Sequence, residues 1–107
     1  MPGTINWNAT FKTGDSSEEV YAEIYDKKGE IVQSKAVPCR PPDDCRFPME
    51  NVEFGTYTAA LVRGEDRYYY VEGLSPITAP NDADNASSIE LTQAGSEISL
   101  NIYVDPA

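Results

Sequence analysis

Two cysteines, Cys39 and Cys45, carry the chemistry of this 107-residue chain that is easiest to state. A zinc site would need Asp43 and Asp44 as further ligands, because the chain has no histidine, and adjacent aspartates suit a tetrahedron poorly. A redox pair needs an activated thiol, usually at a helix N-terminus, and no helix is expected after this loop. The spacing therefore favours a disulfide worth roughly 2–2.5 kcal/mol, which indicates an oxidising compartment.

Clustered oxygen ligands point to a second kind of chemistry, calcium binding, because hard cations take carboxylate and amide oxygens. The candidate ligands are Asn81, Asp82, Asp84 and Asn85. Their segment lacks the glycine and the glutamate of an EF-hand loop, so a solvated acidic loop with local Asx turns is the alternative. Asp15, Glu18 and Glu19 form a similar but weaker cluster.

Tyrosine is unusually frequent, with seven in the chain. Strand alternation directs Tyr21, Tyr25 and Tyr103 away from the core, and in the run 68–70 either Tyr69 or its two neighbours must face outward. The candidate binding face comprises Tyr21, Tyr25, Tyr69 and Tyr103. Such rings can anchor a protein partner or stack on sugars, or they can simply pair across strands and stabilise the sheet.

Catalysis is not expected from this composition. Without histidine, Ser-His-Asp and Cys-His arrangements are impossible. A carboxylate pair for glycoside hydrolysis needs a deep cleft, which a sandwich of this size seldom forms. Gly55, Gly64 and Gly73 stand singly and make no phosphate-binding loop. We therefore predict a chain that is not an enzyme and requires no cofactor other than the calcium considered above.

The charge balance excludes two classes of partner. The net charge is −10, which repels nucleic-acid backbones and anionic lipid surfaces. No apolar run is long enough for membrane insertion. Residues 1–4 lack the basic and apolar pattern of a signal peptide. The chain is then either a protein kept inside the cell or a mature form of a secreted or cell-surface protein, and the cysteines favour the mature form.

The elements that must position these residues are strands, because apolar residues recur at every second position. Ile5, Trp7, Ala9 and Phe11 show the pattern most clearly. We predict strands over 4–12, 19–26, 30–37, 46–52, 56–63, 67–73, 87–92 and 97–104. One core for residues 1–107 then requires an all-β, two-sheet antiparallel sandwich. The longer connections 38–44 and 74–86 are interpreted as crossovers between sheets in preference to functional loops.

The run Met49–Leu61, with its Val52, Gly55 and Tyr57, resembles the Val–Gly-turn–Tyr stretch of carboxypeptidase regulatory-like domains. The hairpin 20–29 and the last strand 98–104 are also similar to that family. The resemblance implies a transthyretin-like (prealbumin-like) sandwich and a non-catalytic accessory or adhesive module, commonly extracellular. In this chain we expect Gly55 to relieve a tight turn and Tyr57 to place its ring in the core with its hydroxyl at the rim.

Together these features predict an extracellular or cell-surface β-sandwich module for protein–protein interaction, adhesion or assembly. Its contacts would come from the tyrosine face, from the loops 38–46 and 74–86, or from the long first strand, pairing with a neighbouring subunit at a sheet edge. Two alternatives stay open at this point. One is a carbohydrate-binding module that uses the tyrosines, and the other is an accessory domain of a secreted peptidase or glycosidase.

Overall fold

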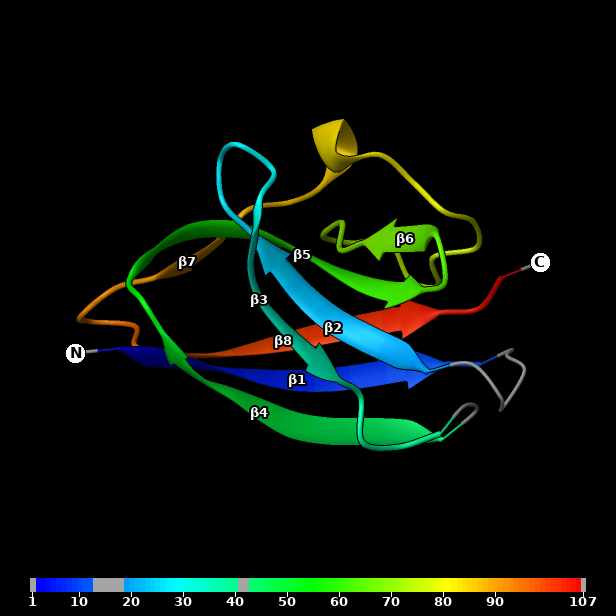
Figure 1. Ribbon diagram of the computed structural model, residues 1–107, viewed down its shortest axis with the longest axis horizontal. Coiled ribbons are helices and arrows are strands. Elements are labelled where there is room, and N and C mark those ends of the chain that lie inside the picture. The colour runs from blue at the N-terminus through cyan, green and yellow to red at the C-terminus, as the bar shows by residue number, and fades with distance from the viewer. Residues whose placement is uncertain (1, 13–18, 41–42, 107) are drawn as a thin grey trace.

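The computed structural model describes residues 2–12, 19–40 and 43–106, and this part of the chain is almost entirely β (Figure 1). The elements are β1 (Gly3–Phe11), β2 (Val20–Tyr25), β3 (Ile31–Ala36), β4 (Asp44–Val52), β5 (Gly55–Arg63), β6 (Asp66–Tyr69), η1 (Ala83–Asn85), β7 (Ile89–Leu91) and β8 (Glu97–Val104). Every predicted strand is present, although β6 ends four residues earlier than expected, at Tyr69. No helix within the described ranges is long and apolar enough to cross a membrane.

The strands form two sheets, which confirms the predicted β-sandwich. One sheet has the order β4-β1-β8, and the other has the order β3-β2-β5-β6, with β7 pairing the first residues of β5. All pairs between these strands are antiparallel except β1 with β8, which run parallel from Thr4 beside Glu97 to Phe11 beside Val104. Alternation specifies which side chains are buried but not the direction of the neighbouring strand, so this pairing was not foreseen.

The position of β1 corrects one expectation. The first strand is not an edge that could accept a neighbouring subunit, because it is hydrogen-bonded to β4 on one side and to β8 on the other. Its burial alternates without interruption along all nine residues. A strand with such a regular apolar face gains most from the centre of a sheet, where neighbours on both sides cover it.

The core lies between the two sheets, and Trp7 is the largest of its fully buried side chains. The indole is fully buried and stacks in parallel on Phe47 of β4, with ring centroids 6.0 Å apart. On the facing sheet, Tyr68 makes a T-shaped contact with Phe11, with ring centroids 5.3 Å apart. Trp7 Nε1 is the buried side-chain polar atom, among the described residues, that has no hydrogen-bond partner. The centre of the sandwich is therefore held by apolar contact and ring packing.

Two turns, one between β2 and β3 and one between β4 and β5, fix the positions of strands in both sheets. Between β2 and β3, Gly29 adopts a φ of 81°, as expected for the left-handed position of a bulged hairpin. The Asp26 carboxylate accepts the N–H groups of Lys28 and Glu30 at 2.8 and 3.0 Å, which closes this turn. Between β4 and β5, the Tyr57 ring is buried and its hydroxyl donates to the Glu53 carbonyl at 2.6 Å, so the predicted placement of this tyrosine is confirmed.

Candidate interaction face

The outer face of the five-stranded sheet, the side that faces away from the other sheet, carries the most unusual side chains. The strand registers place opposite one another on this face Tyr21 and Ala36, Glu23 and Ser34, and Ala60 and Tyr69. The registers place on the outer face Tyr21, Glu23, Tyr25, Ser34, Ala36, Thr58, Ala60, Val62, Arg67 and Tyr69. Such a set is mixed: part of it forms a second apolar cluster, and part is open to solvent.

The apolar part is a small cluster outside the main core. Tyr25, Ala60 and Val62 are buried there, and Tyr69 packs against them. The rings of Tyr25 and Tyr69 lie 5.5 Å apart, and the guanidinium of Arg67 sits 5.7 Å from the Tyr25 centroid. A cation over an aromatic face adds an electrostatic attraction to the burial of the ring. The sheet thus covers part of its own outer face with side chains from β2, β5 and β6.

Glu23 joins this cluster to the edge strand β3. Although it is charged, Glu23 is only 9 % exposed. Its two carboxylate oxygens accept hydrogen bonds from the Tyr25 hydroxyl at 2.7 Å and the Ser34 hydroxyl at 2.9 Å. Hydrogen bonds to a charged acceptor are about twice as strong as neutral ones and offset the cost of burying the carboxylate. The residue was missed in the sequence, because its partner Ser34 is recognisable only once the β2–β3 register is known.

The Tyr25 hydroxyl gives this network a measurable pH dependence. Burial, and then the hydrogen bond to Glu23, raise the pKa of Tyr25 above the usual 10.0. The folded chain therefore keeps this proton where the unfolded chain loses it. The stability contribution is complete below pH 10 and falls by up to about 1.4 kcal/mol per pH unit above it, until the folded state also titrates. Urea unfolding between about pH 8 and pH 11 will show this decline.

The matched variants for this prediction are Tyr25→Phe and Tyr21→Phe. The first removes the buried hydroxyl, so the decline above pH 10 becomes shallower. The second removes an exposed hydroxyl, whose pKa is raised by its hydrogen bond to Glu19, and changes the decline much less. Tyr57 and Tyr68, whose pKa values burial also raises, remain in both variants. Equal slopes for the two variants would contradict the assignment to Tyr25.

The structure places the four tyrosines of the predicted binding face on two sheets and at different depths. They do not share one surface, because Tyr103 lies in β8 of the three-stranded sheet while the others lie on the five-stranded sheet. Nor are they all exposed: Tyr25 is 2 % exposed, since Tyr69 and Arg67 cover it. In the run 68–70 the middle residue, Tyr69, faces outward. Tyr21, at 38 % exposure, is the ring among the four that is open to a partner.

One of the candidate calcium ligands, Asn81, has a structural role, and the other three are exposed. Asn81 runs along the outer edge of β6, where its Oδ1 accepts the Tyr69 N–H at 2.6 Å and its Nδ2 donates to the Tyr69 carbonyl at 3.0 Å. Its amide oxygen is therefore already engaged. Asp82, Asp84 and Asn85 follow at and within η1, all exposed. Within the described ranges no three His, Cys, Asp or Glu side chains are arranged to hold a metal ion. Of the second acidic cluster, Asp15 and Glu18 lie outside the described residues.

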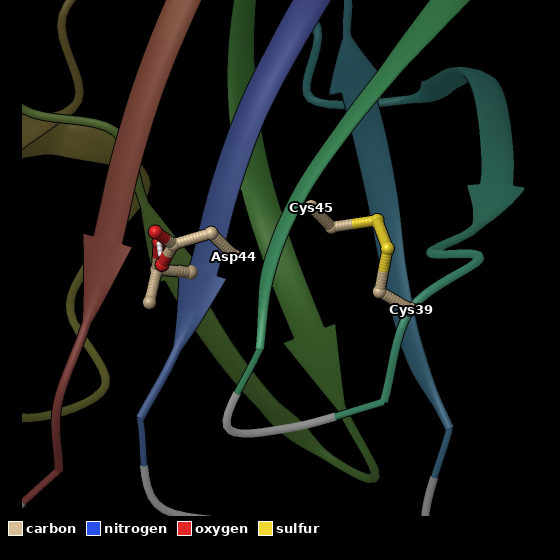
Figure 2. Close-up of a disulfide and its surroundings, with 4 residues drawn as sticks. Cys39, Asp44 and Cys45 are labelled. Atoms are coloured by element: carbon tan, nitrogen blue, oxygen red, sulfur yellow. Dashed lines mark hydrogen bonds between the residues drawn. A yellow bond between two sulfur atoms is a disulfide. The ribbon is translucent and has the colours of Figure 1, made fainter.

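The cysteines form the predicted disulfide, which joins the segment leaving β3 to the start of β4 (Figure 2). Their Cα atoms are 5.5 Å apart, and Cys45 is buried in the main core. Beside it, the Thr10 hydroxyl donates to the Asp44 carboxylate at 2.8 Å, which holds the first residue of β4 against β1. Because β3 and β4 belong to different sheets, the bridge links the two layers of the sandwich at this end.

Comparison with known proteins gives a likeness of fold. No family model matches the chain, and no curated protein matches it. Among solved structures, the chain is similar to BcpA, the major pilin subunit of Bacillus cereus, with a TM-score of 0.56 and 12 % sequence identity. The likeness covers 96 % of this chain but only 30 % of the pilin chain. At this level of identity the comparison shows a shared β-sandwich fold over nearly all of the chain, and the carboxypeptidase regulatory-like resemblance stays a prediction.

Proposed function

We propose that this chain is a non-catalytic β-sandwich module of a secreted or cell-surface protein, and that it works in adhesion or assembly through contacts with other proteins. The observation that carries the proposal is the fold shared over 96 % of the chain with a major pilin subunit. The disulfide agrees, because such bridges persist in oxidising compartments. The acidic surface keeps such a module soluble until a specific contact forms.

The exposed side chains favour a protein partner over a sugar. Sugar stacking needs flat aromatic rings that are open to solvent, and on the five-stranded sheet Tyr25 is buried and Tyr69 is half-buried. The large apolar side chains that are most exposed in the described residues are Ile31, Leu74, Val32 and Tyr21. Three of these four lie in β2 and β3, and aliphatic side chains on an edge strand suit contact with another chain.

The experiment is protease treatment of intact cells of the source organism. We expect peptides of this chain to be released from the cell surface while a cytosolic marker protein stays intact. In the same cells, Cys39 and Cys45 should resist alkylation until a reductant is added, because they form a bridge. A chain found in the cytosol with both thiols free to react would overturn the proposal.

A further inference from the structure

The edge strand β3 has a free side along which the described residues provide no partner strand. It is the first strand in the order β3-β2-β5-β6, and most of its side chains are exposed. The N–H of Val37, just after β3, donates to the Val20 carbonyl at 2.8 Å. Hydrogen-bonded pairs recur at every second residue of an antiparallel ladder. The backbone groups of residues 33 and 35 therefore face β2, and those of Ser34 and Ala36 face outward. Val32 lies at the register shift between Ile24 and Tyr25, where this alternation is interrupted.

The corresponding edge of the other sheet, β4, is covered by β3 itself. The Lys35 ammonium donates to the Pro48 carbonyl at 2.7 Å, and the Gln33 amide donates to the Glu50 carbonyl at 3.0 Å. These carbonyls point away from β1, so the missing N–H of Pro48 also falls on the free side of β4. A proline at an edge and occupied carbonyls are both devices that prevent a further strand from pairing.

The edge of β6 is covered by the connection that follows it. Besides its two side-chain bonds to Tyr69, Asn81 donates its backbone N–H to the Arg67 carbonyl at 3.2 Å. The end of β8 is covered in a similar way, because Ile77 donates to the Tyr103 carbonyl at 2.8 Å and accepts from Asp105 at 3.0 Å. β8 begins with the charged Glu97, and β7 has just three residues. Charge and shortness both discourage strand addition.

We propose that β3 is the docking edge for a second copy of this chain, so that two five-stranded sheets join antiparallel into one continuous sheet. This inference rests on the proposed assembly function and names the surface that would carry it. A two-fold axis through Ser34 places Ser34 opposite its own equivalent and Ala36 opposite Val32 of the second copy. The two Ser34 residues then exchange both of their backbone hydrogen bonds.

The side chains fit this register. On the outer face Tyr21 lies directly beside Ala36 in the present structure. The register puts Val32 of the second copy next to Ala36, so that exposed apolar side chains of the two copies meet at the junction. Both Tyr21 and Val32 are among the large apolar side chains exposed in the single chain. Cross-strand pairs of this kind each contribute roughly 0.2–1 kcal/mol.

Charge also favours a second copy at this edge. The chain carries 18 acidic residues against 8 basic ones, yet residues 31–37 contain one lysine and no acid. In the proposed register Lys35 stands opposite Gln33, so no charge faces its like directly. The two Glu23 carboxylates would lie three strand spacings apart, about 14 Å. The edge is thus a segment without acidic residues, where two strongly acidic chains can meet.

The experiment measures self-association of the whole chain by sedimentation, up to about 500 μM. We expect a concentration-dependent dimer whose dissociation constant rises at least tenfold in Ala36→Pro and in Val32→Lys. Ala36→Pro removes an N–H that faces the free edge and leaves the ladder to β2 intact. If the circular dichroism of Ala36→Pro shows a loss of folding, the dissociation constant of Val32→Lys tests the proposal in its place. Leu74→Lys is the matched control, since it adds the same charge at an exposed apolar side chain outside β3 and should leave the dimer unchanged.

The register is tested by cross-linking. In Ser34→Cys two copies place their new cysteines as a hydrogen-bonded pair with Cα atoms about 5.5 Å apart, within disulfide range. Gln33→Cys faces Lys35 of the second copy and should not cross-link. A wild-type chain that stays monomeric overturns the proposal, as does a dimer that Val32→Lys leaves unaffected or a monomer that binds an extended peptide at β3 instead. Cell-surface exposure, measured separately, is independent of these outcomes.

Discussion

Replacing Trp7 by alanine is expected to lower the free energy of unfolding by about 3–5 kcal/mol. The indole is 1 % exposed, it stacks on Phe47, and it belongs to the central strand of the three-stranded sheet. Its removal leaves a cavity that neighbours on both sides cannot fill, because β1 is fixed by two ladders. The total free energy of unfolding of a domain of this size is roughly 5–15 kcal/mol, so the variant will be only marginally stable. Urea unfolding followed by circular dichroism measures the change.

Trp7→Phe is the control for that prediction. Phenylalanine keeps a ring against Phe47 and removes the indole N–H, which has no partner in the described structure. A buried N–H without a hydrogen bond costs about 1–3 kcal/mol, and its removal offsets much of the lost ring volume. The phenylalanine variant should therefore lose far less stability than the alanine variant. Similar losses in both would mean that the ring stack contributes little to the core.

Replacing both cysteines by alanine is expected to cost about 2 kcal/mol, the second-largest effect. The bridge closes a loop with a sequence separation of 6, and cross-linking so short a loop removes this much chain entropy from the unfolded state. Since Cys45 lies in the core and the bridge links segments of the two sheets, the midpoint of urea unfolding should fall.

Reduction of the unchanged protein serves as the control for the cysteine variant. It breaks the bridge but leaves both sulfur atoms in place, so it separates the loss of the cross-link from the small cavity that alanine creates at Cys45. We expect reduction to account for most of the shift, and the double variant to lose slightly more. An unfolding midpoint that reductant does not move would show that the bridge does not stabilise this end of the sandwich.

Much of the fold could be predicted because the hydrophobic period is local. The alternation of Ile5, Trp7 and Ala9 specifies a strand with one buried face, whatever its neighbours are. The parallel β1–β8 pair lay beyond such reasoning, since it depends on which distant strand lies beside β1. For the same reason β1 was expected at an edge, although both of its sides are paired.

The candidate site was harder to predict, because exposure depends on what covers a side chain. Alternation correctly put Tyr25 outside the main core, but it cannot show that Tyr69 and Arg67 fold over the ring. Asn81 looked like a metal ligand by composition, and its pairing with Tyr69 from twelve residues away required the path of the loop. The disulfide was predictable because two cysteines a few residues apart have few other uses in such a chain.

The parallel arrangement of β1 and β8 has a mechanical consequence. β1 begins at one end of the long axis and β8 finishes at the other, on a body 38 Å long (Figure 1). Tension applied through these two outer ends pulls the neighbouring strands past each other along their length. The backbone hydrogen bonds between β8 and residues 4–11 of β1 are then loaded together in shear, instead of breaking one after another. Under such tension, this link resists extension until the whole ladder gives way at once.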